Sequence, residues 1–543
     1  MIYKFDNRFI EGETWAIATN SNMLFARNER DQYFCIRSAE DLQTLIGFQN
    51  AHNIFITWDT DVIRYIRQKF SLSLAITFIR MAGLVRNIPY DLACIRAGIV
   101  RLHTPHPDNE LALTAMNLLT LYKKFLKNEC KMLISLSREY HKNFLQTTTS
   151  EVIEKLTSLK PAYNRPTLEF YYQPPQNLSF TMPFLNQLLS DILSEPFKVI
   201  NGKITHAKLP QTFTINNTEI TVGVGGIHGF SLEINRKSTK EKTLIDWDVS
   251  SYYPSLICFD PVLKSILGEA FVTEYDNIRR KRISVKKTDP ILANGLKLVL
   301  NSATGRLNDK KSRLYNPQAY IQITLTGQLY LLMVANMCCD KGIPFYSLNT
   351  DGITLLDNEN HISKPIFDKM TELTGLNFED TVFTHYFARD VNNYFAIKES
   401  DDNEVHIKGK GVFNFDRNIN RNCNNLAVNN LIRLSLDGTN PAVHIAEIPI
   451  SDFIDVACSN STNELFRFYR SKSIPLYPVD ERGVEKPSYL TNKNGRKIPS
   501  TDHCVAISEF AQENDIKEDI DYDWYLEKAE LQLNKILPCF MKK

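Results

Sequence analysis

Two aspartates stand where a carboxylate could take part in phosphoryl transfer. Asp248 ends the apolar run 243–248 (TLIDWD), which predicts a buried strand, and the segment DVSSYYPS then turns at Pro254. Asp351 lies in the polar turn between the apolar runs of 345–356, a pattern typical of a β-hairpin. Carboxylates at such ends can hold divalent metal ions beside phosphate groups. Taken alone, each is more simply interpreted as a residue that ends a strand or caps a turn.

Basic residues lie between these two aspartates in the sequence. Lys297 and Asn301 are four positions apart in a predicted helix, 291–303, so they share one face. Upstream, six of the nine residues at positions 279–287 are basic. A lone charge run is usually a solvated surface. In a chain of formal net charge +1, this concentration favours a phosphate-binding site instead.

The composition is that of a soluble globular protein. The 543 residues predict about three or four domains. Lys plus Arg number 63 and Asp plus Glu 62, so bulk charge alone cannot hold nucleic acid. The charged fraction of 23% and the hydrophobic fraction of 43% exclude disordered and collagen-like chains.

Location is inferred from what the sequence lacks. No apolar run reaches about 18 residues, so no membrane span or membrane partner is expected. The polar start of the chain, residues 1–8, does not resemble a secretory signal, and the ten cysteines form no CxxC pair. We therefore expect a cytoplasmic protein with reduced thiols.

A mixed α/β chain must position these groups. Prolines predict a connector at about 160–185. Apolar residues recurring at three- and four-residue steps predict helices, and shorter apolar runs around glycines predict strands. The expected helices are 109–159, 291–303, 319–340 and a last one near 523–537, and the expected strands lie within 211–235 and 243–248.

The order of these segments resembles the polymerase core of family B DNA polymerases. DVSSYYPS at 248–255 is similar to that family's DxxSLYPS motif, KLVLNSATG at 297–305 to KxxxNSxYG, and SLNTDG at 347–352 to YxDTDS. The resemblance implies an α/β multidomain chain: a right-hand polymerase of the small phage or mobile-element type, with an N-terminal RNase H-like exonuclease-type domain. The implied domains are an exonuclease-like domain at 1–165, a connector and start of the palm with the GGIHG segment at 166–242, a first palm segment at 243–265, short fingers at 266–312, a second palm segment at 313–405 and a thumb at 406–543.

The resemblance also implies roles for individual residues. Asp248 and Asp351 would be the catalytic acids and, with the carbonyl of Val249, the ligands of two Mg²⁺ ions, for which Mn²⁺ can substitute. Lys297, Arg282 and Lys286 would bind the nucleotide's phosphates, and Asn301 would line the base-pair pocket. Tyr253 would lie under the sugar and exclude a 2′-hydroxyl, with Tyr252 as the competing candidate. The residues expected to contact primer–template DNA are Gly225, Gly226, Tyr394, Lys408 and Lys410.

Three positions depart from the family pattern. Asn349 replaces the first acid of the hairpin motif, which is expected to lower metal affinity. Thr304 replaces a tyrosine and removes a ring from the pocket wall. Asn392 replaces the lysine of the KxY motif, which is expected to weaken the grip on the primer.

The N-terminal domain is expected to be an exonuclease fold without activity. A two-metal exonuclease needs about four carboxylates. The sequence offers only a remnant, Glu11, Glu13, Asp61 and Asn117, in which an amide stands in an acid's place. In the alternative alignment, Asp108 or Glu110 completes a real site.

The resemblance implies a template-directed DNA polymerase that extends a primer with dNTPs for phage or mobile-element replication. Asp248 precedes Lys297 by 49 positions, and Lys297 precedes Asp351 by 54. Neither interval has room for the insertions that grip a terminal protein, so such a partner is not expected. Two alternatives stay open: a self-priming or template-independent polymerase, and a catalytically weakened polymerase fold that binds DNA.

Overall fold

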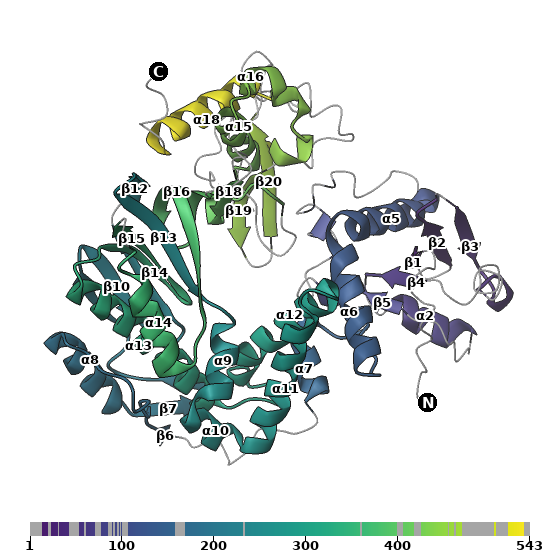
Figure 1. Cartoon of the computed structure of the whole chain (residues 1–543). Coiled ribbons are helices and arrows are strands. Elements are labelled where there is room, and N and C mark those ends of the chain that lie inside the picture. Colours follow the sequence, from purple (N-terminus) through teal and green to yellow (C-terminus); the bar gives the residue numbers. More distant parts are fainter. Residues whose placement is uncertain are drawn as a thin grey trace. The chain divides into compact units, whose positions relative to one another are not determined.

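The structure is a computed structural model of the whole chain (Figure 1). The residues that it describes are 14–19, 23–30, 32–42, 54–58, 61–70, 78–84, 90, 93–94, 97, 99, 107–157, 169–231, 234–358, 361–398, 406–417, 425–453, 455–460, 463–469, 504–506 and 520–536. The chain divides into two compact units. The first unit combines Met1–Thr148 with Val412–Lys543, and the second is Thr149–Gly411. The expected mixed α/β multidomain chain is confirmed.

A ten-stranded sheet forms the centre of the second unit. Its order is β18-β17-β16-β13-β15-β14-β11-β10-β9, with β12 paired to β16, and its neighbours run antiparallel. The strands are β9 (Gln211–Ile215), β10 (Thr218–Val222), β11 (Ile227–Ser231), β12 (Ile234–Lys237), β13 (Lys242–Val249), β14 (Phe345–Asn349), β15 (Gly352–Asn358), β16 (Phe378–Asp390), β17 (Asn393–Lys398) and β18 (His406–Lys410).

Strand β13 lies inside this sheet because its side chains are buried on both faces. Leu244, Ile245 and Trp247 are buried, and so is Asp246. β13 pairs with β15 on one side and β16 on the other. The predicted strand and the predicted hairpin, β14–β15, are therefore confirmed, and the end of β13 lies beside the hairpin's tip. The sequence predicted that Pro254 closes the turn after β13, and this prediction is wrong. Residues 250–251 make that turn, and Pro254 lies in the first turn of the following helix, α9.

Helices of the second unit begin at side chains that satisfy their free backbone N–H groups. Asp289 accepts the N–H of Leu292 at the start of α12, and Asn316 accepts that of Ala319 at the start of α13. A proline occupies the first turn of both helices, where its missing N–H costs nothing. The helices are α7 (Val152–Leu156), α8 (Pro183–Leu193), α9 (Tyr252–Phe259), α10 (Pro261–Leu267), α11 (Glu269–Val285), α12 (Pro290–Leu307), α13 (Pro317–Asp340), α14 (Lys364–Thr374) and the 3₁₀ turn η3 (Thr149–Glu151).

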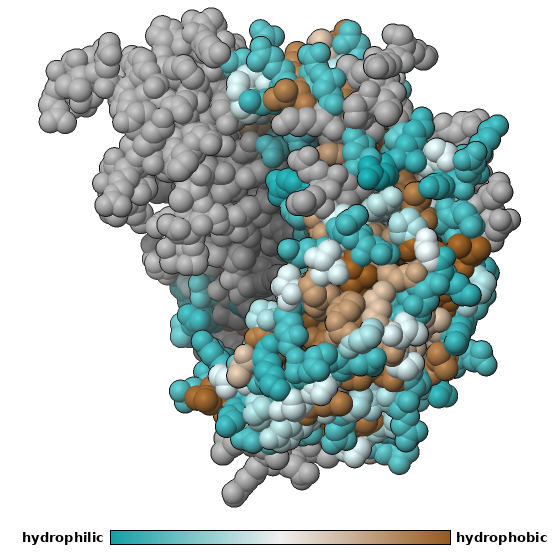
Figure 2. Space-filling model, turned by 90° about the vertical axis from the view of Figure 1, so that its left-hand side faces the viewer, coloured by the Kyte–Doolittle hydropathy of each residue, from teal (hydrophilic) through white to brown (hydrophobic). Residues whose placement is uncertain are grey.

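Helix α13 is the core helix of this unit. Among the described helices, it alone is long and apolar enough to cross a membrane, but 94% of its apolar window is buried inside the protein. A buried helix of this kind packs against the protein's own elements, here α9, α10 and α12. A small sheet, β6 (Glu169–Phe170), β7 (Phe197–Ile200) and β8 (Lys203–Thr205), completes the unit. On the face drawn in Figure 2, the coloured surface mixes hydrophilic and hydrophobic side chains.

The N-terminal part of the first unit contains a five-stranded sheet in the order β3-β2-β1-β4-β5. β1, β4 and β5 run parallel, whereas β2 and β3 run antiparallel to their neighbours. Trp15 and Ile17 are fully buried in its core. The elements are β1 (Thr14–Thr19), β2 (Leu24–Asn28), β3 (Tyr33–Ile36), β4 (Ile54–Thr57), β5 (Phe78–Arg80), α2 (Asp61–Phe70), α3 (Met81–Leu84), α5 (Pro107–Leu121), the π-helical turn η2 (Tyr122–Leu126) and α6 (Lys127–Glu139).

The predicted helix 109–159 is interrupted in the structure. It ends with α6 at Glu139, and His141 takes the left-handed conformation with φ of 51°. Helicity resumes only at η3 and α7, which belong to the second unit. Serine, histidine and asparagine residues after position 136 are poor helix formers, which accounts for the break.

The C-terminal part of the first unit holds a three-stranded sheet and several helices. The Tyr525 hydroxyl of α18 donates a hydrogen bond of 2.9 Å to the carbonyl of Phe453. The elements are η4 (Gly411–Phe413), α15 (Leu426–Leu436), α16 (Pro441–His444), η5 (Ile445–Glu447), η6 (Ile450–Phe453), β19 (Asp455–Asn460), β20 (Asn463–Tyr469), β21 (Cys504–Ala506) and α18 (Tyr522–Ile536).

The units differ from the sequence-based domains at two boundaries. The sequence placed 149–165 with the N-terminal domain, but Glu154 of α7 forms an ion pair with Arg306 of α12, so the described residues 149–157 pack in the second unit. The sequence placed 406–410 in a separate thumb, but β18 pairs with β17 along its whole length and extends the large sheet. The second boundary therefore follows Gly411.

Candidate functional site

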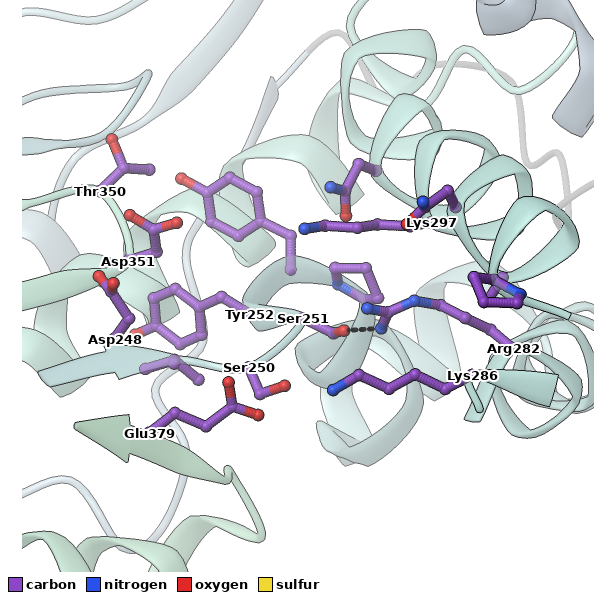
Figure 3. A pocket seen from close by; sticks show the side chains of 17 residues that line it. Asp248, Ser250, Ser251, Tyr252, Arg282, Lys286, Lys297, Thr350, Asp351 and Glu379 are labelled. Carbon is purple, nitrogen blue, oxygen red and sulfur yellow. Dashed lines mark hydrogen bonds between the residues drawn. The ribbon is translucent and has the colours of Figure 1, made fainter. Parts of the chain in front are cut away.

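A pocket of about 670 Å³ opens between the end of β13, the hairpin tip and helices α11 and α12. Nine of the candidate site residues singled out from the sequence line it: Asp248, Val249, Tyr252, Tyr253, Arg282, Lys286, Lys297, Asn301 and Asp351. Figure 3 shows the two aspartates on one side of the pocket and the three basic side chains on the other. The pocket thus has an acidic wall and a basic wall.

Backbone pairing forms the acidic wall. The N–H of Val249 donates a hydrogen bond of 2.7 Å to the carbonyl of Asp351, and Asp248 is opposite Gly352 in the register of β13 and β15. Gly352 has no side chain, and the Asp248 carboxylate occupies the space that a Cβ would take. Glycine is therefore required at this position for the carboxylate to lie over the hairpin.

The electrostatics of Asp248 are those of a crowded acid. Burial, followed by the charges of Asp246 and Asp351, raises the pKa of Asp248 to about 6, while Lys408 and Lys410 oppose that shift. A cation bound here would offset the repulsion between the carboxylates.

The donor set fits Mg²⁺, which the family resemblance implies. Two carboxylates and the Val249 carbonyl are hard oxygen ligands, and Mg²⁺ usually binds through one or two carboxylates together with water and substrate phosphates. Among the described residues, no three His, Cys, Asp or Glu side chains gather as a metal site. Any ion held here would therefore need ligands from substrate or water.

The basic wall comes from two packed helices. Lys297 and Asn301 lie one turn apart on α12, as predicted, and Arg282 and Lys286 come from the end of α11. Arg282 donates a hydrogen bond to the Ser251 hydroxyl, drawn as a dashed line in Figure 3. Arg279 and Arg280 are tied to Asp276, each at 2.7 Å, and do not line the pocket.

The structure distinguishes the two adjacent tyrosines. Tyr252 is buried, and its hydroxyl donates a short hydrogen bond of 2.5 Å to the carbonyl of Gly327. Tyr253 is half-buried, lines the pocket, and its hydroxyl lies 3.8 Å from the position of a Cβ on Gly226. Tyr252 also lines the pocket, but Tyr253 is the more exposed of the two rings and its hydroxyl is not the one bound to Gly327.

The residues predicted to contact DNA lie near the pocket but outside its lining. A Cβ on Gly226 would be 3.4 Å from the Thr350 hydroxyl, and one on Gly225 would be 3.9 Å from that of Tyr320. Tyr394 on β17 is opposite Lys410 on β18. Burial, and then the charge of Lys410, lowers the pKa of His228, so Lys410 also faces the GGIHG segment.

Sequence reasoning missed one carboxylate of the pocket. Glu379 on β16 is opposite Asp248 in the sheet and lines the pocket beside Ser250 and Ser251. No sequence signal marked Glu379, because only the strand register brings it to Asp248. Asp246, two positions before Asp248, could have been noticed as an acid within an apolar run.

The three departures have local explanations. The Asn349 side chain accepts the N–H of Thr350 at 2.9 Å and stabilises the hairpin turn. Thr304 is buried and is not among the residues that line the pocket, and the expected loss of a ring from the pocket wall stays a prediction. Asn392 lies in the turn between β16 and β17, where its N–H donates to Asp390.

The predicted exonuclease residues are only partly brought together. Glu11 and Glu13 lie outside the described residues. Asp61 begins α2 and lines a second pocket of about 700 Å³ with Glu110. Asn117 is buried on α5 and does not line that pocket. Of the described candidates, Glu110 rather than Asn117 therefore lies near Asp61.

Comparisons with known proteins find similarity among solved structures. No protein-family model matches the chain, and no curated protein matches it either. Among solved structures, the chain is similar to the family B DNA polymerase from the hyperthermophilic archaeon Pyrobaculum calidifontis. The identity is 11% and the TM-score 0.42, over 98% of this chain and 78% of the archaeal chain.

Proposed function

We propose that this chain is a template-directed DNA polymerase that extends a primer with dNTPs. The proposal rests on the pocket in which Asp248 and Asp351 face Arg282, Lys286 and Lys297. An acidic wall opposite a basic wall suits a substrate that carries both a metal-bound triphosphate and a reacting hydroxyl. In this proposal the large sheet is the palm, α11 and α12 are the fingers, and the C-terminal region is the thumb.

The residues of the chain would position the reactants. Asp248, Asp351 and the Val249 carbonyl would hold two Mg²⁺ ions. Such ions would supply positive charge to the attacking hydroxyl oxygen of the primer and to the leaving phosphate oxygen of the nucleotide. Lys297, Arg282 and Lys286 would bind the triphosphate and offset its developing charge. The hydrogen bond between Arg282 and Ser251 would give way to a phosphate oxygen, a stronger acceptor for a guanidinium.

Tyr253 and Asn301 would select the nucleotide. The Tyr253 ring would lie under the deoxyribose and leave no space for a 2′-hydroxyl. Asn301, one turn beyond Lys297 on α12, would line the nascent base pair. Gly225, Gly226 and Tyr394 would contact the primer–template backbone, which supplies affinity without sequence preference.

The N-terminal region would be an RNase H-like domain without exonuclease activity. The support for this fold is its sheet, ordered β3-β2-β1-β4-β5, in which β2 runs opposite to the other four strands. The proposal also includes replication of phage or mobile-element DNA in a host cytoplasm, without a terminal protein.

Primer extension tests the function. A labelled primer on a single-stranded template is incubated with Mg²⁺ and either dNTPs or rNTPs, with controls that lack primer or template. Template-dependent dNTP addition is expected. Products formed without primer or template would favour the self-priming or template-independent polymerase. DNA binding without any product would favour the weakened fold that only binds DNA.

A further inference from the structure

Two lysines that the sequence treats alike have different surroundings. Lys408 and Lys410 lie two positions apart on β18 and therefore on one face. The Lys408 ammonium lies 3.5 Å from the Asp246 carboxylate, and the two side chains are 34% and 12% exposed. Lys410 makes no ion pair with any residue that the structure describes, and its ammonium lies 5.6 Å from the centre of the Tyr394 ring.

Asp246 belongs to the strands that carry the catalytic acids. It lies two positions before Asp248 on β13, so both side chains are on the same face. Its second oxygen accepts a hydrogen bond of 2.7 Å from the Thr354 hydroxyl on β15. Asp246 is opposite Thr354, as Asp248 is opposite Gly352. Without Lys408, this face would carry a further, uncompensated carboxylate beside the candidate metal site.

A buried carboxylate without a counter-ion is costly, and it attracts whatever cation can reach it. At the edge of a metal site, that cation would be a divalent ion bound at Asp246 instead of at Asp248 and Asp351. The Lys408 ammonium, which belongs to the protein itself, is the counter-ion of Asp246. It also lies 5.4 Å from the centre of the Tyr394 ring. The charge of Lys408 is thus paired with Asp246, whereas Lys410 makes no ion pair among the described residues and its ammonium can also meet an external anion.

We infer that Lys408 is the internal counter-ion of Asp246, and that Lys410 is the lysine that binds DNA phosphate. Lys408 is then a positioning residue: it prevents Asp246 from competing with Asp248 and Asp351 for divalent metal. This inference rests on the proposed function, from which it takes the metal and the DNA.

Two binding measurements on the full chain test the inference without relying on activity. Electron paramagnetic resonance measures the affinity for Mn²⁺, and fluorescence anisotropy measures how DNA affinity depends on salt. The variants are Lys408→Met, Asp246→Asn, the double variant, and Lys410→Met as the matched control.

The two single variants of the pair should shift Mn²⁺ affinity in opposite directions. Lys408→Met exposes a negative charge and should tighten Mn²⁺ binding about tenfold, and Asp246→Asn leaves a positive charge and should weaken it by a similar factor. The double variant should return close to the wild-type value. The slope of log DNA affinity against log salt concentration should change by about 0.9 in Lys410→Met and should not change in the other variants.

A different pattern overturns the inference. If Lys408→Met lowers the salt slope by about 0.9 and leaves Mn²⁺ binding unchanged, Lys408 is a phosphate contact. If Lys408→Met does not fold, Asp246→Asn and the double variant still test the inference. Mn²⁺ affinity equal to that of the wild type in both of these variants contradicts the proposed role of the pair. If the wild type binds no Mn²⁺, the proposed metal site itself fails; if it binds Mn²⁺ and the variants do not differ, only the inference fails.

Discussion

Replacing Gly352 with alanine places a methyl group where the Asp248 side chain lies. A Cβ at this position would be 2.7 Å from the carbonyl oxygen of Trp247 and 3.3 Å from the Cα of Asp248, and it would overlap the Asp248 carboxylate. Cβ atoms do not approach other atoms so closely. The Asp248 side chain must therefore move, and the paired backbone of β13 and β15 must also shift to clear the Trp247 carbonyl.

The expected loss follows from the displacement. Moving a catalytic group by about 1 Å lowers the rate by about 100-fold, which corresponds to about 2.7 kcal/mol of activation free energy. We therefore expect Gly352→Ala to reduce the single-turnover rate of primer extension by about this factor. DNA affinity, measured by anisotropy, should change little by comparison, and the thermal unfolding temperature should fall because the backbone must shift to clear the Trp247 carbonyl.

Gly223→Ala is the matched control, because a Cβ there would meet only the Pro210 side chain, at 3.9 Å. It should extend primers at the wild-type rate. The reasoning is refuted if folded Gly352→Ala protein retains a rate within a few-fold of wild type. An equal loss in Gly223→Ala would show general sensitivity of this sheet rather than displacement of Asp248.

Three further predictions concern the acids, the sugar and the N-terminal pocket. Asp351→Asn should abolish extension and leave DNA binding intact, because one carboxylate cannot clamp two ions; extension near the wild-type rate would remove Asp351 from the site. Tyr253→Ala should raise ribonucleotide incorporation with little effect on dNTP use, and a change seen only in Tyr252→Ala would move the sugar contact by one residue. The Asp351→Asn protein should not shorten a 3′-mismatched primer with Mg²⁺ or Mn²⁺; brisk shortening that is lost in Asp61→Ala or Glu110→Ala would reveal an active exonuclease.

Local patterns predicted the elements that carry the acids. The apolar run before Asp248 and the two runs around Asp351 correspond to β13 and the β14–β15 hairpin, since strand burial leaves a direct mark on composition. Four-residue spacing correctly placed Lys297 and Asn301 on one face of α12. Local periodicity thus determined which residues could share a face.

Local sequence patterns could not predict contacts between strands that are distant in the sequence. Glu379 reaches the pocket only because β16 pairs with β13, and Lys408 meets Asp246 across a separation of 162 residues. The end of the large sheet at β18 was also missed, because a short strand of glycine and lysine carries little apolar signal. Register between strands depends on the whole sheet and leaves no periodicity in one segment.

The central claim is that Asp248 and the basic wall opposite it perform nucleotidyl transfer on a primed template. The most direct test is extension of a labelled primer by the wild type and by Asp248→Asn, at equal concentration and with Mg²⁺ and all four dNTPs. We predict template-dependent extension by the wild type and none by the variant, with equal DNA binding by both. Equal extension by the two proteins, or none by a folded, DNA-binding wild type, would contradict the account.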